Sequence, residues 1–181
     1  MVEDAVPLEA VHRALVVKLR HQGDVLLASP VFTALKRKAP HVEIDALVYS
    51  ETAPMLTGHP SIGEVFCIER SWKTLAPFAQ ASAEWKLFSQ LRARRYDLIL
   101  HLTEHWRGAW LSRLLGPRWA VGPKVRGRGG AWKRSFTHLV STPLASGRHV
   151  VETNLDALRR IGIYPPPSER ALTLIAGPPA E

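Results

Sequence analysis

The segment RALVVKLRHQGDVLLASPVF, residues 13–32, joins an apolar run to a polar turn and then to a second apolar run. Its first part is short and β-branched, which is typical of a buried strand. The polar part does not suit a protein core. Its members are Lys18, Arg20, His21, Gln22, Gly23 and Asp24. The segment therefore predicts a strand that ends in a tight turn or in a binding site.

Short apolar segments alternate with amphipathic ones along the rest of the chain. Strands are expected at residues 13–19, 42–49, 64–68, 96–102 and 119–121, with a further one at ALTLI, residues 171–175. Helices are expected at residues 24–38, 52–57, 72–95, 106–115 and 150–161, and a glycine-rich loop at 124–134. This alternation predicts an α/β domain whose mostly parallel sheet is covered by helices on both faces.

Ligands of such sheets bind beyond the carboxyl ends of the strands. Residues 18–24 occupy that place after the first strand, and residues 101–107 occupy it after the fourth. The two polar segments are therefore expected to line one site. The turn contains neither GxGxxG nor a Walker A pattern, so it is not a standard nucleotide fingerprint.

Two roles are open for Asp24 on chemistry alone. It is a suitable N-cap for the helix that follows, and Gly23 suits a tight turn where only glycine fits. Alternatively, an ionised carboxylate at the edge of a cleft takes a proton from an attacking hydroxyl. Pro30 lies inside the expected helix and predicts either a kink or a fresh helix start capped by Ser29.

Length and composition indicate one globular domain, or one domain with a tail. The chain has 181 residues, of which 46% are hydrophobic and 22% charged. The single cysteine, Cys67, excludes an internal disulfide framework. The acidic N-terminus does not read as a signal peptide, and no apolar run reaches the length of a membrane span. We therefore expect a cytoplasmic protein.

The net charge of +8 is concentrated in one part of the chain. No acidic residue lies between Glu104 and Glu152, a stretch that carries nine bases. These bases are Arg107, Arg113, Arg118, Lys124, Arg126, Arg128, Lys133, Arg134 and Arg148. Such a block favours an anionic partner. Nucleic acid, an anionic membrane surface and a phosphorylated substrate are all candidate partners.

Four stretches of the chain resemble glycosyltransferase family 9, the bacterial lipopolysaccharide heptosyltransferases. They are VVKLRHQGDVLLASPVFTALKRKAP, IDALVYSETAPMLTGHPSIGEVFCIER, RRYDLILHLTEHWRGAWLSRLLGPRWAVG and HVVETNLDALRRIGI, in that order. The resemblance covers about residues 12–164. The stretches LRHQGDVLL and THLVST look most like the heptosyltransferase III branch of the family.

The resemblance implies a GT-B glycosyltransferase, in which two Rossmann-like domains face a cleft. Such an enzyme transfers heptose from ADP-heptose to a heptose or Kdo hydroxyl of the lipopolysaccharide inner core. The transfer inverts the anomeric centre and requires neither a metal nor a cofactor. In the family, the acid of the Gly-Asp pair is the proposed general base, and Asp24 occupies that position.

The resemblance also implies where the chain ends within such an enzyme. Residues 12–164 would form the Rossmann-like acceptor-binding domain, with an extension at 1–11 and a Pro-rich linker at 165–181. The C-terminal domain, which binds ADP-heptose, would be missing. We therefore expect a fragment that is inactive alone, and peripheral association of the enzyme with the cytoplasmic face of the inner membrane.

Acceptor contacts are expected from the polar turn and from basic residues at the same edge of the sheet, because arginine suits carboxylates and phosphates. The residues expected to bind substrate are Lys18, Arg20, His21, Gln22, Gly23, Arg70, Lys73, Arg107, Arg126, Arg128 and Lys133. His101 and His105 are four residues apart, but a strand end separates them, so no metal site is expected. The aromatic residues from Phe78 to Phe88 have helical spacing, which suits either the core or a membrane.

Two other classes of function compete with the transferase. The basic block with its interleaved tryptophans also suits a nucleic-acid-binding module or an adaptor for anionic membranes, without catalysis. No recognised nucleic-acid motif is present, and we expect no nucleic-acid partner.

Overall fold

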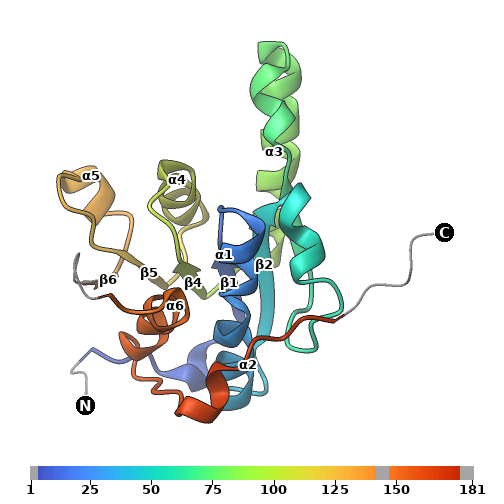
Figure 1. Ribbon diagram of the computed structural model, residues 1–181. Helices are drawn as coiled ribbons and strands as arrows, with labels where there is room; N and C mark the ends of the chain where they lie inside the picture. Colours follow the sequence, from blue (N-terminus) through green and yellow to red (C-terminus); the bar gives the residue numbers. More distant parts are fainter. Residues whose placement is uncertain (1–3, 142–146, 176–181) are drawn as a thin grey trace.

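A parallel six-stranded sheet forms the centre of the computed structural model, which describes residues 4–141 and 147–175, the side chain of Lys73 excepted. The strands are β1 (Arg13–Val17), β2 (Glu43–Tyr49), β3 (Val65–Ile68), β4 (Leu98–His101), β5 (Trp119–Pro123) and β6 (His138–Val140). Their order is β3-β2-β1-β4-β5-β6, the order of a Rossmann sheet (Figure 1). Every neighbouring pair is parallel, which confirms the predicted fold class.

Helices cover both faces because successive side chains of a strand point to opposite faces. Ala14 and Val16 of β1 belong to the core beneath α1 (Gln22–Leu26), α2 (Ser29–Lys38) and α6 (Val150–Arg159). Leu15 and Val17 belong to the core on the other face, beneath α3 (Pro77–Arg94) and α4 (Trp106–Leu115). α5 (Gly130–Lys133) packs Trp132 against α4 and β5. The short 3-10 segments are η1 (Leu8–Ala10), η2 (Ser50–Met55), η3 (Arg70–Thr74) and η4 (Pro167–Arg170).

The segment 24–38 is not one helix, as predicted, but two. α1 ends at Leu26, and α2 begins at Ser29 after Ala28. Pro30 lies in the first turn of α2, where its missing N–H removes no helical hydrogen bond. Proline thus marks a fresh start. Ser29 is the first helical residue and not the cap.

Three further sequence-based expectations differ from the structure. The stretch 124–134 contains α5, and the chain returns to the sheet as β6, which was not predicted. The stretch 171–175 forms no strand; the backbone N–H of Thr173 donates to Ser29 Oγ at 3.0 Å instead. This segment lies along α2, so no neighbouring strand is available to pair with it.

The C-terminal end of α3 is attached to the sheet, and its N-terminal end extends away from the body (Figure 1). Arg94 donates to the fully buried carboxylate of Asp45 on β2 at 2.9 Å, and the Tyr96 hydroxyl donates to the same carboxylate at 2.7 Å. Leu87 and Leu91 are the buried residues of α3. Most of this helix therefore has little contact with the core.

The close approach of α4 to β4 generates a prediction about stability. A Cβ added at Gly108 would overlap the imidazole ring of His101, which is buried and surrounded by aromatic rings. We expect Gly108→Ala to lower the free energy of unfolding by about 2 kcal/mol or more, because neither partner has space to move. Chemical denaturation measures this change.

Gly23→Ala is the matched control. Gly23 lies in α1, and a Cβ there meets no atom within 4 Å. We expect this substitution to leave stability unchanged or to raise it slightly. Equal losses in the two variants would contradict the close-packing argument.

Candidate active site

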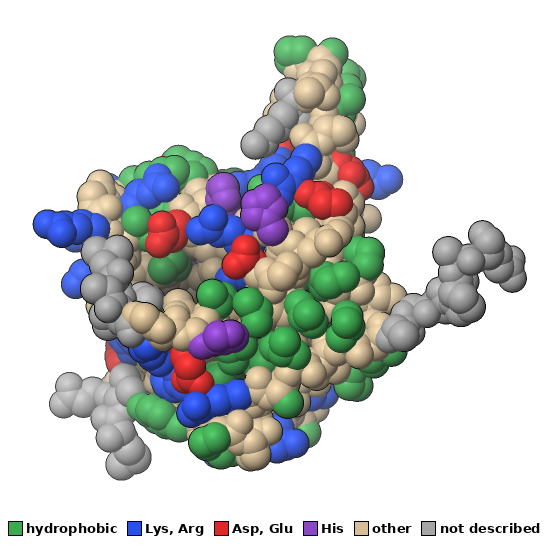
Figure 2. All heavy atoms as spheres, in the orientation of Figure 1, with side chains coloured by type: hydrophobic (Ala, Val, Ile, Leu, Met, Phe, Trp, Pro, Cys, Tyr) green, Lys and Arg blue, Asp and Glu red, His purple; other side chains and the backbone are tan. Residues whose placement is uncertain are grey.

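The two polar segments expected to form a site do lie at one edge of the sheet. Val17 pairs with both Leu47 and His101, so β1, β2 and β4 end side by side. The chain continues the pairing just beyond, where the Leu102 N–H donates to the Val17 carbonyl at 3.0 Å. Figure 2 shows Lys, Arg, Asp, Glu and His side chains gathered over α1 and α4 at the foot of α3. The predicted meeting of residues 18–24 with 101–107 is therefore confirmed.

Asp24 lies on the first turn of α1 and is partly exposed. It is not the N-cap predicted from the sequence, because His21 occupies that position and makes no side-chain capping bond. The helix begins two residues earlier than expected. Among the described residues, none donates a hydrogen bond to the Asp24 carboxylate. The carboxylate is thus available to a molecule outside the domain.

The surroundings of Asp24 are open. Arg20, His21, Gln22 and Gly23 are exposed. Gly23 has no positive φ and no atom near its Cβ direction, so the expectation that only glycine fits this turn is wrong. Because glycine has no side chain, the space beside the backbone at Gly23 stays open and permits close approach of another molecule. Gln22 Nε2 donates to the Glu51 carbonyl at 3.1 Å, which connects the turn to η2.

Lys18 lies beneath this turn and not on its surface. Its side chain is 5% exposed, and Nζ donates to Asn154 Oδ1 at 2.8 Å and to the Leu102 carbonyl at 3.2 Å. Burial lowers the pKa of Lys18 to about 8, and the nearby charge of Asp24 acts in the opposite direction. Direct substrate contact by Lys18 was expected, but its amine is occupied by the protein itself.

Asn154 is the residue of this region that sequence reasoning missed. It lies on α6, and its Nδ2 donates to the Leu27 carbonyl at the C-cap of α1 at 2.9 Å. One amide thus holds both the Lys18 ammonium and the end of the helix that carries Asp24. The available signal was an asparagine on the buried face of an amphipathic helix, spaced with Val151, Leu155 and Leu158.

Two predicted arginines are held by carboxylates of neighbouring elements. Arg70 of η3 pairs with Glu51, and its guanidinium lies 4.2 Å from the centre of the Tyr49 ring. Arg107 of α4 pairs with Glu84 of α3, and partial burial lowers its pKa. Through Glu51, Arg70 is brought close to Gln22. Lys73 lies in η3, but its side chain is outside the described residues.

The remaining three predicted residues share a separate basic pocket of about 260 Å³. Its lining is Lys124, Val125, Arg126, Gly127, Arg128, Lys133 and Ser141. Arg128 is positioned by its bond to the Glu104 carbonyl at 3.2 Å and by the rings of Trp106 and Trp132, at 5.0 and 5.2 Å. This lining contains no carboxylate, so the pocket suits a carboxylate or phosphate group.

His101 is a core residue at the end of β4. Its ring stacks on Phe136 at a centroid distance of 5.5 Å, and burial lowers its pKa to about 3, which keeps the imidazole neutral. Within the described residues, no group of three His, Cys, Asp or Glu side chains is placed to hold a metal ion.

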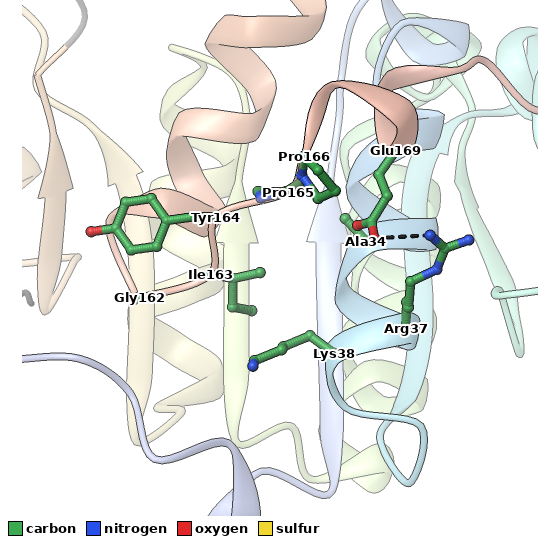
Figure 3. Close-up of a pocket in the computed structure, with 9 residues that line it drawn as sticks. All are labelled: Ala34, Arg37, Lys38, Gly162, Ile163, Tyr164, Pro165, Pro166 and Glu169. Atoms are coloured by element: carbon green, nitrogen blue, oxygen red, sulfur yellow. Dashed lines mark hydrogen bonds and ion pairs between the residues drawn. The ribbon is translucent and has the colours of Figure 1, made fainter.

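A further pocket, of about 340 Å³, lies at the opposite edge of the sheet, where α2 ends (Figure 3). Arg37 pairs with Glu169 across it at 2.8 Å, and Pro165 and Pro166 form part of its wall. This contact attaches the Pro-rich segment to α2. None of the residues predicted to bind substrate lies in it.

Comparison with known proteins identifies the family of the chain. A family model described as "Glycosyltransferase family 9 (heptosyltransferase)" matches residues 84–175. Lipopolysaccharide heptosyltransferase 3 of Escherichia coli is 38% identical over 161 residues, which is 83% of this chain and 46% of that protein. Lipopolysaccharide heptosyltransferase 1 of Pseudomonas aeruginosa is 28% identical over 158 residues. The chain spans less than half the length of these relatives.

Solved structures share the fold. The family 9 glycosyltransferase of Veillonella parvula superposes with a TM-score of 0.72 at 20% identity, covering 90% of this chain and 44% of that one. The E. coli heptosyltransferase WaaC with ADP-2-deoxy-2-fluoro heptose gives a TM-score of 0.70 at 22% identity, covering 86% of this chain and 50% of that one. None of the helices within residues 4–141 and 147–175 is both long and apolar enough to cross a bilayer. The chain belongs to glycosyltransferase family 9, the heptosyltransferases.

Proposed function

We propose that this chain is the acceptor-binding part of a lipopolysaccharide core heptosyltransferase. The reaction moves heptose from ADP-heptose to a heptose or Kdo hydroxyl of the inner core. The observation that carries the proposal is the placement of Asp24, a partly exposed carboxylate beside the open space at Gly23 and above the buried ammonium of Lys18. The similarity to heptosyltransferase 3 of E. coli supports the choice of donor and acceptor.

In the proposed mechanism, Asp24 takes the proton of the acceptor hydroxyl as its oxygen attacks the anomeric carbon of heptose. A new C–O bond forms on one face, the bond to the diphosphate breaks on the other, and the electron pair leaves with ADP. The configuration is therefore inverted. The charges of Asp24 and Lys18 interact, since the carboxylate raises the pKa of the ammonium against the effect of burial.

Acceptor recognition is assigned to the basic side chains at the edge. The pocket of Arg126, Arg128 and Lys133 would hold a carboxylate or phosphate of the core sugar. The other proposed contacts come from Arg20, His21, Gln22, Gly23, Arg70, Lys73 and Arg107. Lys18 would act from below, by positioning the turn. The nucleic-acid alternative is not retained, because the chain belongs to the heptosyltransferases, and we assign an anionic sugar to the basic pocket.

The donor and the location complete the proposal. The part of the relatives that this chain does not match is the proposed site of ADP-heptose binding. The acceptor carries a lipid anchor, so we place the reaction on the cytoplasmic face of the inner membrane, with the enzyme bound peripherally.

Replacement of Asp24 tests the base. In protein expressed from the complete reading frame, we expect Asp24→Asn to lower kcat by about 10²- to 10⁴-fold, because the amide cannot accept the proton. The KM for acceptor should change little, since the side chain keeps its size. Steady-state assays of ADP release measure both constants. Full turnover by Asp24→Asn would exclude the base role.

The charge interaction between Lys18 and Asp24 is testable in the isolated chain. We expect NMR titration of the Lys18 side chain to give a pKa of about 8, and Asp24→Asn to lower it further because an attractive charge is lost. Glu51→Gln, which removes a carboxylate that is no part of the Lys18 contacts, is the matched control. An unchanged Lys18 pKa in Asp24→Asn would show that the two groups do not interact.

The same pKa shift predicts how stability depends on pH. The pKa of Lys18 is lower in the folded chain than in the unfolded one, so the unfolded chain retains the proton to higher pH. Relative to Lys18→Met, the free energy of unfolding should therefore rise between about pH 8 and pH 10.4. Denaturation at several pH values measures the difference. A flat difference across this range would contradict the shift.

The basic pocket generates a prediction about acceptor affinity. We expect Arg126→Gln and Lys133→Gln each to raise the Kd for a phosphorylated core oligosaccharide by about 10-fold, since each removes one charged hydrogen bond. Arg134→Gln is the control, because this exposed arginine belongs to the same basic block but does not line the pocket. Calorimetry with the soluble oligosaccharide gives the three constants. Equal weakening in all variants would indicate a general charge effect.

A further inference from the structure

The projecting helix α3 carries large apolar side chains that no other part of the described chain covers. Phe78, at its outer end, is 87% exposed, and Trp85 is 68% exposed. Leu75, just before the helix, is 41% exposed. The sequence left open whether the aromatic residues of this helix face the core or a membrane, and the structure places Phe78 and Trp85 outside the core. Such exposure is costly in water and points to a binding surface.

These side chains form one continuous stripe. Phe78, Ala81, Trp85 and Phe88 are spaced by three or four residues, which places them on one face of the helix. α4 contributes a second apolar stripe. It consists of Trp110, Leu111 and Leu114, of which Trp110 is 51% and Leu114 is 59% exposed. This second stripe and all of the α3 stripe except Phe78 line a groove of about 820 Å³, with Glu84, Arg92 and Arg107.

The unpaired charges on these two helices are positive. Glu84 is the acidic residue of α3, α4 has none, and Glu84 is neutralised by Arg107. Lys86, Arg92 and Arg113 are exposed on the same two helices, and none of them makes an ion pair within the described residues. Arg92 lines the groove, and its guanidinium lies 5.9 Å from the centre of the Phe88 ring. The two helices therefore combine an aromatic and aliphatic groove with an excess of positive charge.

We propose that this α3–α4 face docks on the surface of an anionic lipid bilayer. Tryptophan and phenylalanine are suited to the boundary between headgroups and acyl chains, and the exposed basic residues of the two helices gain from the negative surface potential. A second copy of the chain is a poorer occupant. In a two-fold dimer, the same positively charged helices would face each other and be repelled.

The position of the face fits the site already described. α4 begins immediately after β4, at the edge of the sheet that carries Asp24, and the outer end of α3 projects beyond the same edge (Figure 1). A bilayer in contact with Phe78 would thus lie beside the candidate site. This inference rests on the proposed function only for its biological setting, since the exposed stripe and its charge stand without it.

Vesicle binding tests the inference. Protein from the complete reading frame is mixed with vesicles of phosphatidylcholine, alone or with about 30 mol% phosphatidylglycerol, and bound protein is measured by flotation. We expect binding to the anionic vesicles with a blue shift of tryptophan emission. The double variant Phe78→Ser/Trp85→Ser should bind at least about 10-fold more weakly. Lys86→Gln/Arg92→Gln should lose binding to a similar extent, and salt should weaken the wild type.

Exposed apolar residues elsewhere provide the matched control. Tyr164 is 62% and Leu174 is 56% exposed, and both lie outside the α3–α4 face. Tyr164→Ser/Leu174→Ser should bind vesicles within about twofold of the wild type. Thermal melts of all variants confirm that each is folded. Equal losses in the control and face variants would overturn the inference, as would a wild-type protein that does not bind anionic vesicles.

Two measurements separate the alternatives. A wild-type dimer in solution that Trp85→Ser converts to a monomer would assign the face to a second copy and overturn the proposal. Heptose transfer to a deacylated, water-soluble acceptor reports on the site without a bilayer, and the face variants should retain it. Failure of that transfer in the wild type would contradict the proposed function while leaving the vesicle result intact.

Discussion

The buried ammonium of Lys18 is the constraint on which the candidate site depends. An ammonium removed from water is costly unless the protein supplies acceptors in good geometry. Here Asn154 and the Leu102 carbonyl supply them, and the other end of the Asn154 amide holds the Leu27 carbonyl. Strand β1, the β4–α4 connection, α6 and the C-cap of α1 thus meet at one polar contact. The helix that carries Asp24 is held at its C-terminal end by Asn154, which follows Leu27 by 127 positions in the chain.

This arrangement explains why a lysine stands at the end of a buried strand. A shorter or apolar side chain would leave the Asn154 and Leu102 oxygens without their donor, which is itself unfavourable. The charge of Asp24 is felt at Lys18, where it opposes the effect of burial on the pKa of the ammonium. The same lysine therefore supports the fold and interacts electrostatically with the proposed base. Substitution of Asp24 is expected to change the pKa of Lys18.

Much of this organisation was predictable from local sequence, because the signals involved are local. Apolar runs with turn residues between them placed the first five strands, and the helix Trp106–Leu115 was predicted at its observed bounds by its ending in Gly116-Pro117. The expectation that residues 18–24 and 101–107 line one site followed from their places after strands of a parallel sheet. The features that the sequence did not predict depend on contacts between residues far apart in the chain. Asn154 gains its role only through Lys18, and β6, with three residues, is too short to carry a periodic pattern.

The distribution of arginines shows how the fold separates two kinds of positive charge. Arg70 and Arg107 are each matched by a carboxylate of a neighbouring element, so their guanidinium groups are fixed in place at the edge of the sheet. Preorganised groups of this kind suit recognition of one defined ligand, because little ordering remains to be done on binding. Lys86, Arg92 and Arg113 on the outside of α3 and α4 have no such partners among the described residues. They keep rotational freedom, which suits a surface such as a bilayer that presents many equivalent anions and no fixed geometry.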